Sequence, residues 1–465
     1  MIIDCVTYFQ EADLLELRMA ELDGLVDLWV IVEGNRTHAG APKDSHLRAN
    51  FGRFQKYANR MVVWMADLPA GDGLTWTWRR EIAQRNAIQD ALKSLHLSPD
   101  DMILISDCDE IPRREFIAAL PGLAPDAVAI AQQRLYYYTF NHTAPDVVWN
   151  GTRATQWANV QALGADGVRY ASKERGGFPH ILNAPNAGWH FSYFGGPEYV
   201  KTKIESFLHQ ELNHPEHRDE ATIKERIATG QDVYGRPWQS FDIGAAIDLP
   251  DAVYEQPATW QHHFHPDYAP LFHEGWTNAE HSTALSMIAR FAPQEGICVE
   301  VGSWEGVSTI ALAHGLGERT LYAVDTWAGN SDEDPNHYTV RVVKERDVYA
   351  QFLRNVAAYG KAYIEPKRMD WSLWAARNDS PIAFIHLDAS HDEQSVRDQI
   401  AAFLPRLVPN GIICGDDYYA EGVKAAVNAA IPDVVNNGRI WWWRRKDVNQ
   451  YNYQSYSDGE RQYTQ

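Results

Sequence analysis

The sequence predicts an α/β protein made of two domains in succession. Apolar strands alternate with amphipathic helices from residue 2 to about residue 112, and the same alternation restarts near residue 297. Between them, residues 247–270 are rich in proline, histidine and aromatic side chains, which favours a domain boundary there. We therefore expect a first domain at residues 1–250, a linker at 251–271, a second domain at 272–446 and a polar, tyrosine-rich tail at 447–465.

The first domain is expected to begin with a strand at residues 2–8. The helix after it carries Leu15, Met19 and Leu22 at the spacing of one helical face. The remaining elements are apolar strands at residues 28–32, 61–64 and 102–105 and a long helix that includes residues 88–95. Strands that alternate with helices form a largely parallel sheet, which binds ligands at the carboxyl ends of its strands.

The second domain repeats this order. Its strands are predicted at residues 297–302, 321–325, 382–388 and 411–417. Each strand ends at a glycine turn or at acidic residues, so the candidates for function lie at one edge of the predicted sheet.

Composition excludes several classes of protein. Among the 465 residues, 42 are basic and 62 are acidic, a net charge of −20 that argues against a general nucleic-acid binder. The four cysteines lie far apart, which disfavours a zinc or dithiol site and favours a reducing compartment. No apolar run approaches the ~18 residues of a membrane span, and no secretory leader is recognised, so we expect a cytoplasmic protein. The oligomeric state is left open.

Two carboxylates follow the strand at 102–105. Asp107 and Asp109 are two residues apart and would point the same way in an extended chain. Oxygen ligands of this kind suit Mg²⁺ or Mn²⁺, which would neutralise a diphosphate leaving group. The alternative is an acidic turn, in which Asp109 caps the following helix.

The first half resembles glycosyltransferase family 17, the β-1,4-mannosyl-glycoprotein N-acetylglucosaminyltransferases. The matching stretches span about residues 1–215 and are residues 11–18, 29–37, 84–86, 106–112 and 188–194, with Lys203 and His209 downstream. The resemblance implies a GT-A-like nucleotide-sugar fold, a nucleotide-sugar donor and inversion at the anomeric carbon. It also implies site roles: Asp107 and Asp109 on metal and diphosphate, Glu33 near the nucleotide, Arg85 near the diphosphate, and His190 as a third ligand or acceptor contact.

Each of these residues has an alternative reading. Arg85 could pair with Glu81 along its helix, and His190 lies between two aromatic residues as a core histidine would. The general base of an inverting transfer is left open among Glu110, Glu174, Glu198 and Glu211. Animal members of the family are anchored in membranes of the secretory pathway. Since we expect no anchor here, their glycoprotein acceptor is not transferred to this chain.

A glycine turn follows the first strand of the second half. Gly302 and Gly306 let a ligand approach the backbone, and Glu300 before them suits a cationic ligand such as S-adenosylmethionine. Asp325 ends the next strand, where a carboxylate binds ribose hydroxyls. The dinucleotide pattern G-x-G-x-x-G is incomplete, which weakens a nicotinamide interpretation. An ordinary tight turn is the alternative.

Three further carboxylates end the later strands. Asp388, Asp416 and Asp417 would together form an oxygen-rich Mg²⁺ site that binds and activates a substrate hydroxyl. The alternative is that they are separate helix caps.

Residues 272–446 resemble the class I methyltransferases, specifically the metal-dependent O-methyltransferases like macrocin O-methyltransferase. The resemblance implies a Rossmann-like fold with a cofactor turn at Glu300, Gly302, Ser303, Gly306 and Ser308. It places Asp325 on the ribose and Asp370 near the adenine, and the metal on Asp388, Asp416 and Asp417. Asp388 or His391 would be the base. The family commonly has Asp-Gly-Asp-His where this chain has Asp388-Ala-Ser-His391, a departure that keeps the first aspartate.

A bifunctional enzyme is the leading interpretation: one half transfers a sugar and the other methylates a hydroxyl, with a glycan as acceptor. Two alternatives remain, a glycan-binding module joined to an active methyltransferase, and a nicotinamide oxidoreductase in the second half. The neighbouring His262, His263 and His265 are interpreted as linker histidines rather than a metal site.

Overall fold

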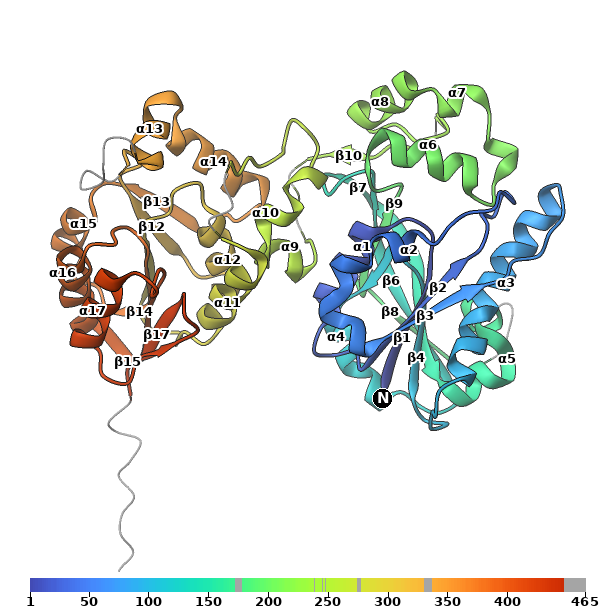
Figure 1. Cartoon of the computed structure of the whole chain (residues 1–465), viewed down its shortest axis with the longest axis horizontal. Coiled ribbons are helices and arrows are strands. Elements are labelled where there is room, and N and C mark those ends of the chain that lie inside the picture. The colour runs from blue at the N-terminus through green and yellow to red at the C-terminus, as the bar shows by residue number, and fades with distance from the viewer. Residues whose placement is uncertain are drawn as a thin grey trace, which may run out of the picture. The chain divides into compact units, whose positions relative to one another are not determined.

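A computed structural model describes residues 1–171, 178–237, 239–244, 246, 248–273, 277–329 and 337–446. The chain divides into two compact units. The first unit comprises Met1–Tyr254, Thr259–Pro270 and Ala358–Gly360, and the second comprises Glu255–Ala258, Leu271–Ala357 and the chain from Lys361 onward. Figure 1 shows the elements of each unit. The predicted linker at 251–271 contains helices α9 (Asp251–Glu255) and α10 (Pro257–Trp260).

The first unit is built on a mixed sheet of ten strands, in the order β3-β2-β1-β4-β7-β6-β9-β5, with β10 on β7 and β8 on β6. The first four strands of that order are parallel, and β7 then pairs antiparallel with β4. The prediction of a largely parallel sheet is therefore right for this part of the sheet only. The strands are β1 Ile2–Tyr8, β2 Leu28–Gly34, β3 Met61–Ala66, β4 Met102–Asp107, β5 Glu110–Pro112, β6 Ala127–Tyr137, β7 His142–Gln156, β8 His180–Ala184, β9 Gly188–Ser192 and β10 Asp242–Ile243.

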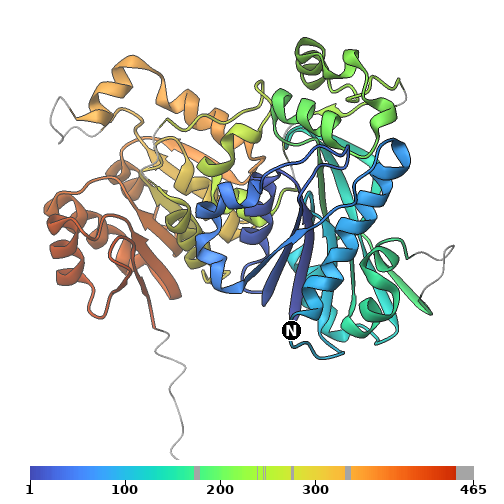
Figure 2. The same ribbon diagram turned by 45° about the vertical axis from the view of Figure 1, so that its right-hand side comes forward.

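Helices cover both faces of this sheet. Leu15 and Met19 of α1 pack in one apolar core with Ile31 of β2, whereas Ile88 of α3 packs in another with Val30. Alternate residues of one strand therefore serve opposite cores, as the strand period requires. Figures 1 and 2 show α3 and α5 together on one face. The helices are α1 Ala12–Leu22, α2 His46–Ala49, α3 Leu74–Lys93, α4 Arg114–Ala119, α5 Trp157–Arg169, α6 Gly196–Ser206, α7 Pro215–Arg218 and α8 Glu220–Thr229, with 3-10 turns at Phe51–Arg60, Leu120–Gly122, Gln210–Leu212 and Gln261–His263.

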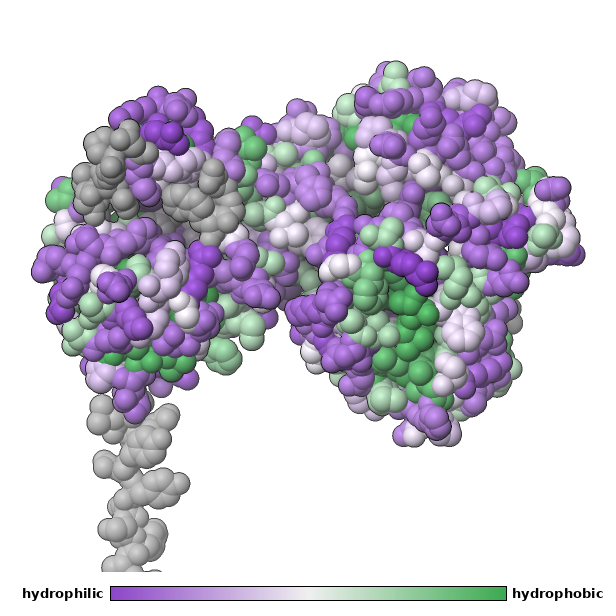
Figure 3. Space-filling view, viewed as in Figure 1, coloured by the Kyte–Doolittle hydropathy of each residue, from purple (hydrophilic) through white to green (hydrophobic). Residues whose placement is uncertain are grey.

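The surface in view is hydrophilic over most of both units. Figure 3 shows an apolar band over β3, the strand that ends the sheet of the first unit. Val63 and Met65 of this strand are each 44% exposed. The outer edge of β3 pairs with no other strand in the part of the chain that the structure describes.

The second unit contains a seven-stranded sheet in the order β13-β12-β11-β14-β15-β17-β16. The pairs from β13 to β15 are parallel, and β17 returns antiparallel beside β15. The strands are β11 Ile297–Val301, β12 Leu321–Asp325, β13 Ile364–Arg368, β14 Ile382–Leu387, β15 Leu407–Gly415, β16 Val435–Asn436 and β17 Trp441–Arg444. The helices are α11 Ala279–Arg290, α12 Val307–Leu316, α13 Tyr338–Glu345, α14 Val348–Ala358, α15 Trp371–Arg377, α16 Glu393–Phe403 and α17 Glu421–Ala430, with a 3-10 turn at Leu404–Arg406.

The α/β class predicted from the alternation is confirmed in both units. Each predicted strand of the second half is present, because buried apolar runs bounded by turns form central strands. Three strands of this sheet are not predicted from the sequence: the edge strands β13 and β16, and β17 between β15 and β16. None of the helices within the described ranges has the length and apolar character needed to cross a bilayer.

Candidate active sites

A cavity of about 700 Å³ opens at the carboxyl ends of β1, β2 and β4 in the first unit. Asp107 and Asp109 both line it, as do Arg85 and His190, so the structure brings together four of the residues that the sequence singled out. Asp107 ends β4, but Cys108 and Asp109 form a turn before β5. The two carboxylates thus reach one cavity through a turn and not through the extended chain that we expected.

Two basic side chains contact Asp109. Lys203 of α6 donates a hydrogen bond to its Oδ2 at 3.0 Å, and Nε2 of His190 lies 3.6 Å from its Oδ1. Burial opposes ionisation of this carboxyl, but the charges of Lys203 and His190 outweigh it and hold the pKa of Asp109 well below its usual range. Asp109 is therefore a carboxylate, and it is not the helix cap of the alternative reading, since α4 begins at Arg114.

Asp107 contacts a different set of cations. Nη2 of Arg169 lies 3.2 Å from its Oδ2, and Nη2 of Arg85 lies 3.5 Å from its Oδ1, which also accepts from Thr7 at 3.1 Å. Burial acts to raise the pKa of Asp107, but the charges of Arg169 and Arg85 outweigh burial and lower the pKa to about 2. Its negative charge is balanced by guanidinium groups.

The geometry of Asp109 and His190 fits two ligands of one divalent cation. Their ligand atoms, Oδ1 and Nε2, lie 3.6 Å apart, and Nδ1 of His190 is buried without a hydrogen-bond partner. His190 stacks on Trp149, with ring centroids 4.3 Å apart. Hard cations take one or two protein carboxylates plus substrate phosphate oxygens. Asp107, held by two arginines, is less suited to be a ligand than the sequence suggested.

Arg85 and Glu33 are held by other protein groups. Arg85 donates to Glu81 at 2.6 Å and to Asp166 at 2.8 Å in addition to its contact with Asp107. Glu33 is fully buried and accepts from Ser45 at 2.7 Å, from the amide of His46 at 2.8 Å and from Lys43. Glu33 therefore holds the loop after β2 in place.

The four candidates for the general base have different surroundings. Glu110 is buried and accepts from Trp149 at 2.7 Å and from Arg169. Glu211 lies on the surface, with its Oε1 2.6 Å from Nδ1 of His209. Glu198 lies in the first turn of α6, and Glu174 lies outside the described residues. The base stays unassigned.

In the second unit, the turn after β11 requires glycine at its first position. Gly302 has a φ of +89°, and a Cβ atom there would lie 2.0 Å from the carbonyl oxygen of Asp388. Gly306 has a φ of +91° and precedes α12. Gly302 therefore permits β11 and β14 to approach closely at their carboxyl ends.

Glu300 stabilises this turn from beneath. Its buried carboxylate accepts hydrogen bonds from Ser303 at 2.7 Å, Ser308 at 2.7 Å and Thr309 at 2.5 Å. The sequence predicts that Glu300 faces a cationic ligand. Because three hydroxyl groups occupy its oxygens, its role in this structure is to join the turn to α12.

Asp325 ends β12 beside the same turn. It accepts from the amides of Ser303 at 2.8 Å, Trp304 at 2.9 Å and Trp327 at 2.7 Å. Burial raises the pKa of Asp325, although these amides act against the rise. Asp370 follows β13 and caps α15 by accepting from the amide of Ser372 at 2.8 Å. Asp325 lies at a strand end, as the sequence predicts, whereas Asp370 follows a strand that the sequence did not predict.

Asp388, His391 and Asp417 form a compact group whose ligand atoms lie within 4.8 Å of one another. Nε2 of His391 is 2.7 Å from Oδ2 of Asp417. Asp416, the third carboxylate predicted for this site, instead contacts His281 and Arg439, each at 3.1 Å. The group that the structure brings together therefore contains His391 and does not contain Asp416.

The charges of this group differ. Burial and the neighbouring Asp416 and Asp417 raise the pKa of Asp388 well above its ordinary value. Burial acts to raise the pKa of Asp417, but the hydrogen bonds from His391 and Tyr419 together with the charge of His391 outweigh it, so the pKa is lowered. The carboxylates of Asp388 and Asp417 fit two oxygen ligands of a divalent cation, with the imidazole of His391 beside them. The raised pKa of Asp388 is what adjacent carboxylates produce without a cation.

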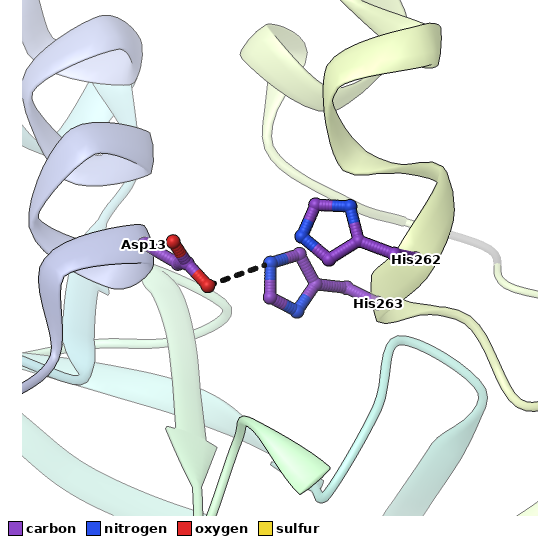
Figure 4. A group of neighbouring side chains, drawn as sticks. All are labelled: Asp13, His262 and His263. Carbon is purple, nitrogen blue, oxygen red and sulfur yellow. Dashed lines mark ion pairs between the residues drawn. The ribbon is translucent and has the colours of Figure 1, made fainter. Parts of the chain in front are cut away.

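The histidines near residue 263 form part of the first unit. Figure 4 shows His262 and His263 facing Asp13 of α1, with an ion pair between His263 and Asp13. Nε2 of His263 lies 3.2 Å from Asp13, whose other oxygen accepts from Arg53 at 2.6 Å. Because a guanidinium already contacts this carboxylate, the group anchors residues 259–270 to α1 better than it suits a metal.

Two family models match separate parts of the chain: glycosyltransferase family 17 over residues 1–241 and a methyltransferase domain over residues 299–418. The β-1,4-mannosyl-glycoprotein 4-β-N-acetylglucosaminyltransferases of Rattus norvegicus and Homo sapiens are each 26% identical to it over 258 residues. These alignments cover 49% of this chain and 47% and 48% of the two relatives. The chain spans about half the length of the curated relatives it matches.

Solved structures similar to the chain include two O-methyltransferases. The O-methyltransferase NovP is 18% identical, with a TM-score of 0.28, over 35% of this chain and 76% of its own. CalS11, the TDP-rhamnose 3′-O-methyltransferase of calicheamicin biosynthesis, is 17% identical, with a TM-score of 0.26, over 36% of this chain and 81% of its own.

Proposed function

Because the chain belongs to glycosyltransferase family 17, we propose that its first unit transfers a sugar, N-acetylglucosamine, from a nucleotide-sugar donor to a hydroxyl with inversion. We propose further that its second unit methylates a hydroxyl of a glycan with S-adenosylmethionine, since a methyltransferase model matches residues 299–418. The protein would then be a bifunctional glycan-modifying enzyme. The observation that carries the first activity is the pairing of Asp109 and His190 inside the cavity.

In the first unit, Asp109 and His190 would hold a Mg²⁺ or Mn²⁺ ion. When bound, this ion would neutralise the charge that develops on the diphosphate as it leaves. Lys203 keeps Asp109 ionised and adds a positive charge on the same side of the cavity. Trp149 stacks on His190 and limits the orientations of its ring.

In the second unit, Asp388, Asp417 and His391 would surround the reacting hydroxyl. A cation held there would lower the pKa of that hydroxyl. His391, paired with Asp417, would accept the hydroxyl proton as the methyl group is transferred. Asp325 would accept the ribose hydroxyls, Asp370 would lie near the adenine, and the turn at Gly302 would carry the rest of the cofactor.

The proposed compartment is the cytoplasm. Cys5, Cys108, Cys298 and Cys414 are buried free thiols, which agrees with a reducing environment.

A product analysis tests both activities. The full chain would be incubated with a panel of nucleotide sugars, Mn²⁺, labelled S-adenosylmethionine and glycan acceptors. The masses of the products would be measured by mass spectrometry. We expect mass gains of a sugar, a methyl group or both. Sugar transfer is expected to fall roughly 10²–10³-fold in Asp109→Asn, with methyl transfer intact, because the cation that would neutralise the leaving diphosphate loses its carboxylate ligand.

Asp90→Asn is the matched control, since Asp90 is an exposed carboxylate of the same unit. Unchanged sugar transfer in Asp109→Asn would reject the role of Asp109. A methyl gain without any sugar transfer would favour a glycan-binding first unit.

A further inference from the structure

Arg153 is a buried cation in the wall of the first unit's cavity. It lies on β7, lines the cavity and is only 8% exposed. Its Nη1 donates to the backbone carbonyls of Asn150 and Gly151, and its Nε has no hydrogen-bond partner. Within the described residues, its printed hydrogen bonds are thus to neutral carbonyls, and a buried guanidinium with an unused N–H has binding capacity left.

The other buried cations of this cavity are already balanced. Arg85 contacts Asp107 and two further carboxylates, Arg169 contacts Asp107 and Glu110, and Lys203 contacts Asp109. Arg153 forms no ion pair with a carboxylate in the described part of the chain. An isolated buried charge destabilises the folded protein, and a bound anion would balance the charge of Arg153.

A second cation lies beside Arg153. Arg169 donates to the same carbonyl, that of Gly151, at 2.6 Å. Burial and the charge of Arg169 lower the pKa of Arg153 to about 10. Two guanidinium groups that converge on one carbonyl repel each other, and an anion between or above them would relieve that repulsion.

The local backbone makes this convergence possible. A Cβ atom at Gly151 would lie 1.7 Å from Oε1 of Gln133, so a side chain cannot be placed there without displacing Gln133. Gly151 lies in an irregularity of the β6–β7 pairing, between the pairs Ile130–Arg153 and Gln132–Asn150. Glycine at 151 therefore leaves room for Gln133 next to the carbonyl that both guanidinium groups contact.

We propose that Arg153, with Arg169 beside it, binds the phosphate oxygens of the donor's diphosphate. This rests on the proposed sugar transfer and names a residue of its donor site. The guanidinium fork matches two phosphate oxygens, and Arg153 offers it without first breaking an ion pair. Arg85, to which the family resemblance assigned this role, would have to exchange three carboxylates for the phosphate.

Calorimetry on the full chain tests this proposal. Inorganic pyrophosphate, UDP-N-acetylglucosamine and uridine would be titrated into the wild-type protein, Arg153→Gln and Arg153→Met, without added divalent cation. We expect both variants to bind pyrophosphate and the nucleotide sugar about ten-fold or more weakly, because a charge-assisted contact is lost. Uridine, which has no phosphate, should bind all three proteins alike.

Arg79→Gln is the control, since Arg79 is an exposed arginine of the same unit. A purely structural role for Arg153 predicts a lower unfolding midpoint, whereas removal of an unbalanced buried charge should leave the midpoint unchanged or raise it. Methionine fills a similar buried space. If Arg153→Gln does not fold, the affinity of Arg153→Met for pyrophosphate tests the proposal instead. Wild-type affinity for pyrophosphate in the folded variant overturns the proposal.

The two proposals fail in different ways. If the wild-type protein binds no member of a nucleotide-sugar panel but binds pyrophosphate through Arg153, the anion site stands and the sugar-transfer proposal fails. If the wild-type protein and the Arg153 variants bind the nucleotide sugar equally, only the role of Arg153 fails.

Discussion

Nε2 of His391 lies 2.7 Å from Oδ2 of Asp417, and both residues follow parallel strands of the second unit. A carboxylate at this distance fixes the orientation of an imidazole ring. The pair lies within the same group as Asp388, so a base and two possible metal ligands surround one point.

His391→Ala is therefore expected to reduce methyl transfer by roughly 10²–10⁴-fold, the usual contribution of a general base. Transfer of label from S-adenosylmethionine measures it. Asp417→Asn should reduce the rate less, because it leaves the imidazole in place. Glu393→Gln, which alters an exposed ion pair with Arg397, serves as the control. Full activity in His391→Ala would remove this residue from the mechanism.

The raised pKa of Asp388 predicts a stability change with pH. The folded state binds the proton of Asp388 more tightly than the unfolded state, whose pKa is near 3.8. Its contribution is therefore favourable at low pH and is lost as pH rises from 3.8 through the folded pKa. Asp388→Asn should increase the free energy of unfolding at neutral pH and flatten this loss, as measured by urea titration across pH.

Bound Mg²⁺ should offset the loss of stability that ionisation of Asp388 causes at neutral pH. A cation bound to ionised Asp388 replaces the proton, so Mg²⁺ or Mn²⁺ should raise the unfolding midpoint of the wild-type protein at neutral pH. Asp388→Asn should lose this rise, whereas the exposed Asp379→Asn should keep it. An equal rise in Asp388→Asn would place the cation elsewhere.

Gly302 and Gly317 provide a matched test of the cofactor turn. Both have positive φ, +89° and +69°, but a Cβ atom at Gly317 meets nothing within 4 Å. Gly302→Ala adds overpacking against Asp388 to the backbone strain and should cost about 3 kcal/mol, against about 1 kcal/mol for Gly317→Ala. Differential scanning calorimetry gives the two values. Similar costs would mean that the turn relaxes without loss.

The contact between Asp13 and His263 predicts acid sensitivity of the first unit. The hydrogen bond from His263, against burial, holds the pKa of Asp13 well below its usual 3.8, and Arg53 adds to this effect. The stabilisation is present above pH 3.8 and is lost as pH falls through the folded pKa. Asp13→Asn should flatten this acid limb of the unfolding curve. Glu16→Gln, which also contacts Arg53, should keep it.

Local patterns predicted the fold elements well, and long-range contacts decided the sites. Leu15 and Met19 predicted α1, and the apolar runs predicted the central strands. The position of His190 beside Asp109 depends on the pairing of β9 with β5, which no local periodicity encodes. The family resemblance suggested that neighbourhood, but periodicity alone could not.

Arg153 and Glu300 show two limits of sequence reasoning. Arg153 lies inside a strand without any motif, and only the fold reveals that it is buried without a carboxylate partner among the residues that the structure describes. Glu300 precedes a glycine turn and was predicted to face a ligand, but serine and threonine hydroxyls from its own turn and helix surround it. In both cases the sequence shows which residue is present, but it does not predict which groups contact its side chain.

The pairing of Asp416 with Arg439 changes the charge balance at the strand ends of the second unit. With that carboxylate neutralised by a guanidinium, Asp388 and Asp417 remain, and together they carry two negative charges when ionised. This equals the charge of one divalent cation, so a loaded site would be electrically neutral. A neutral centre can bind a neutral sugar hydroxyl without repelling the positively charged sulfonium of the methyl donor.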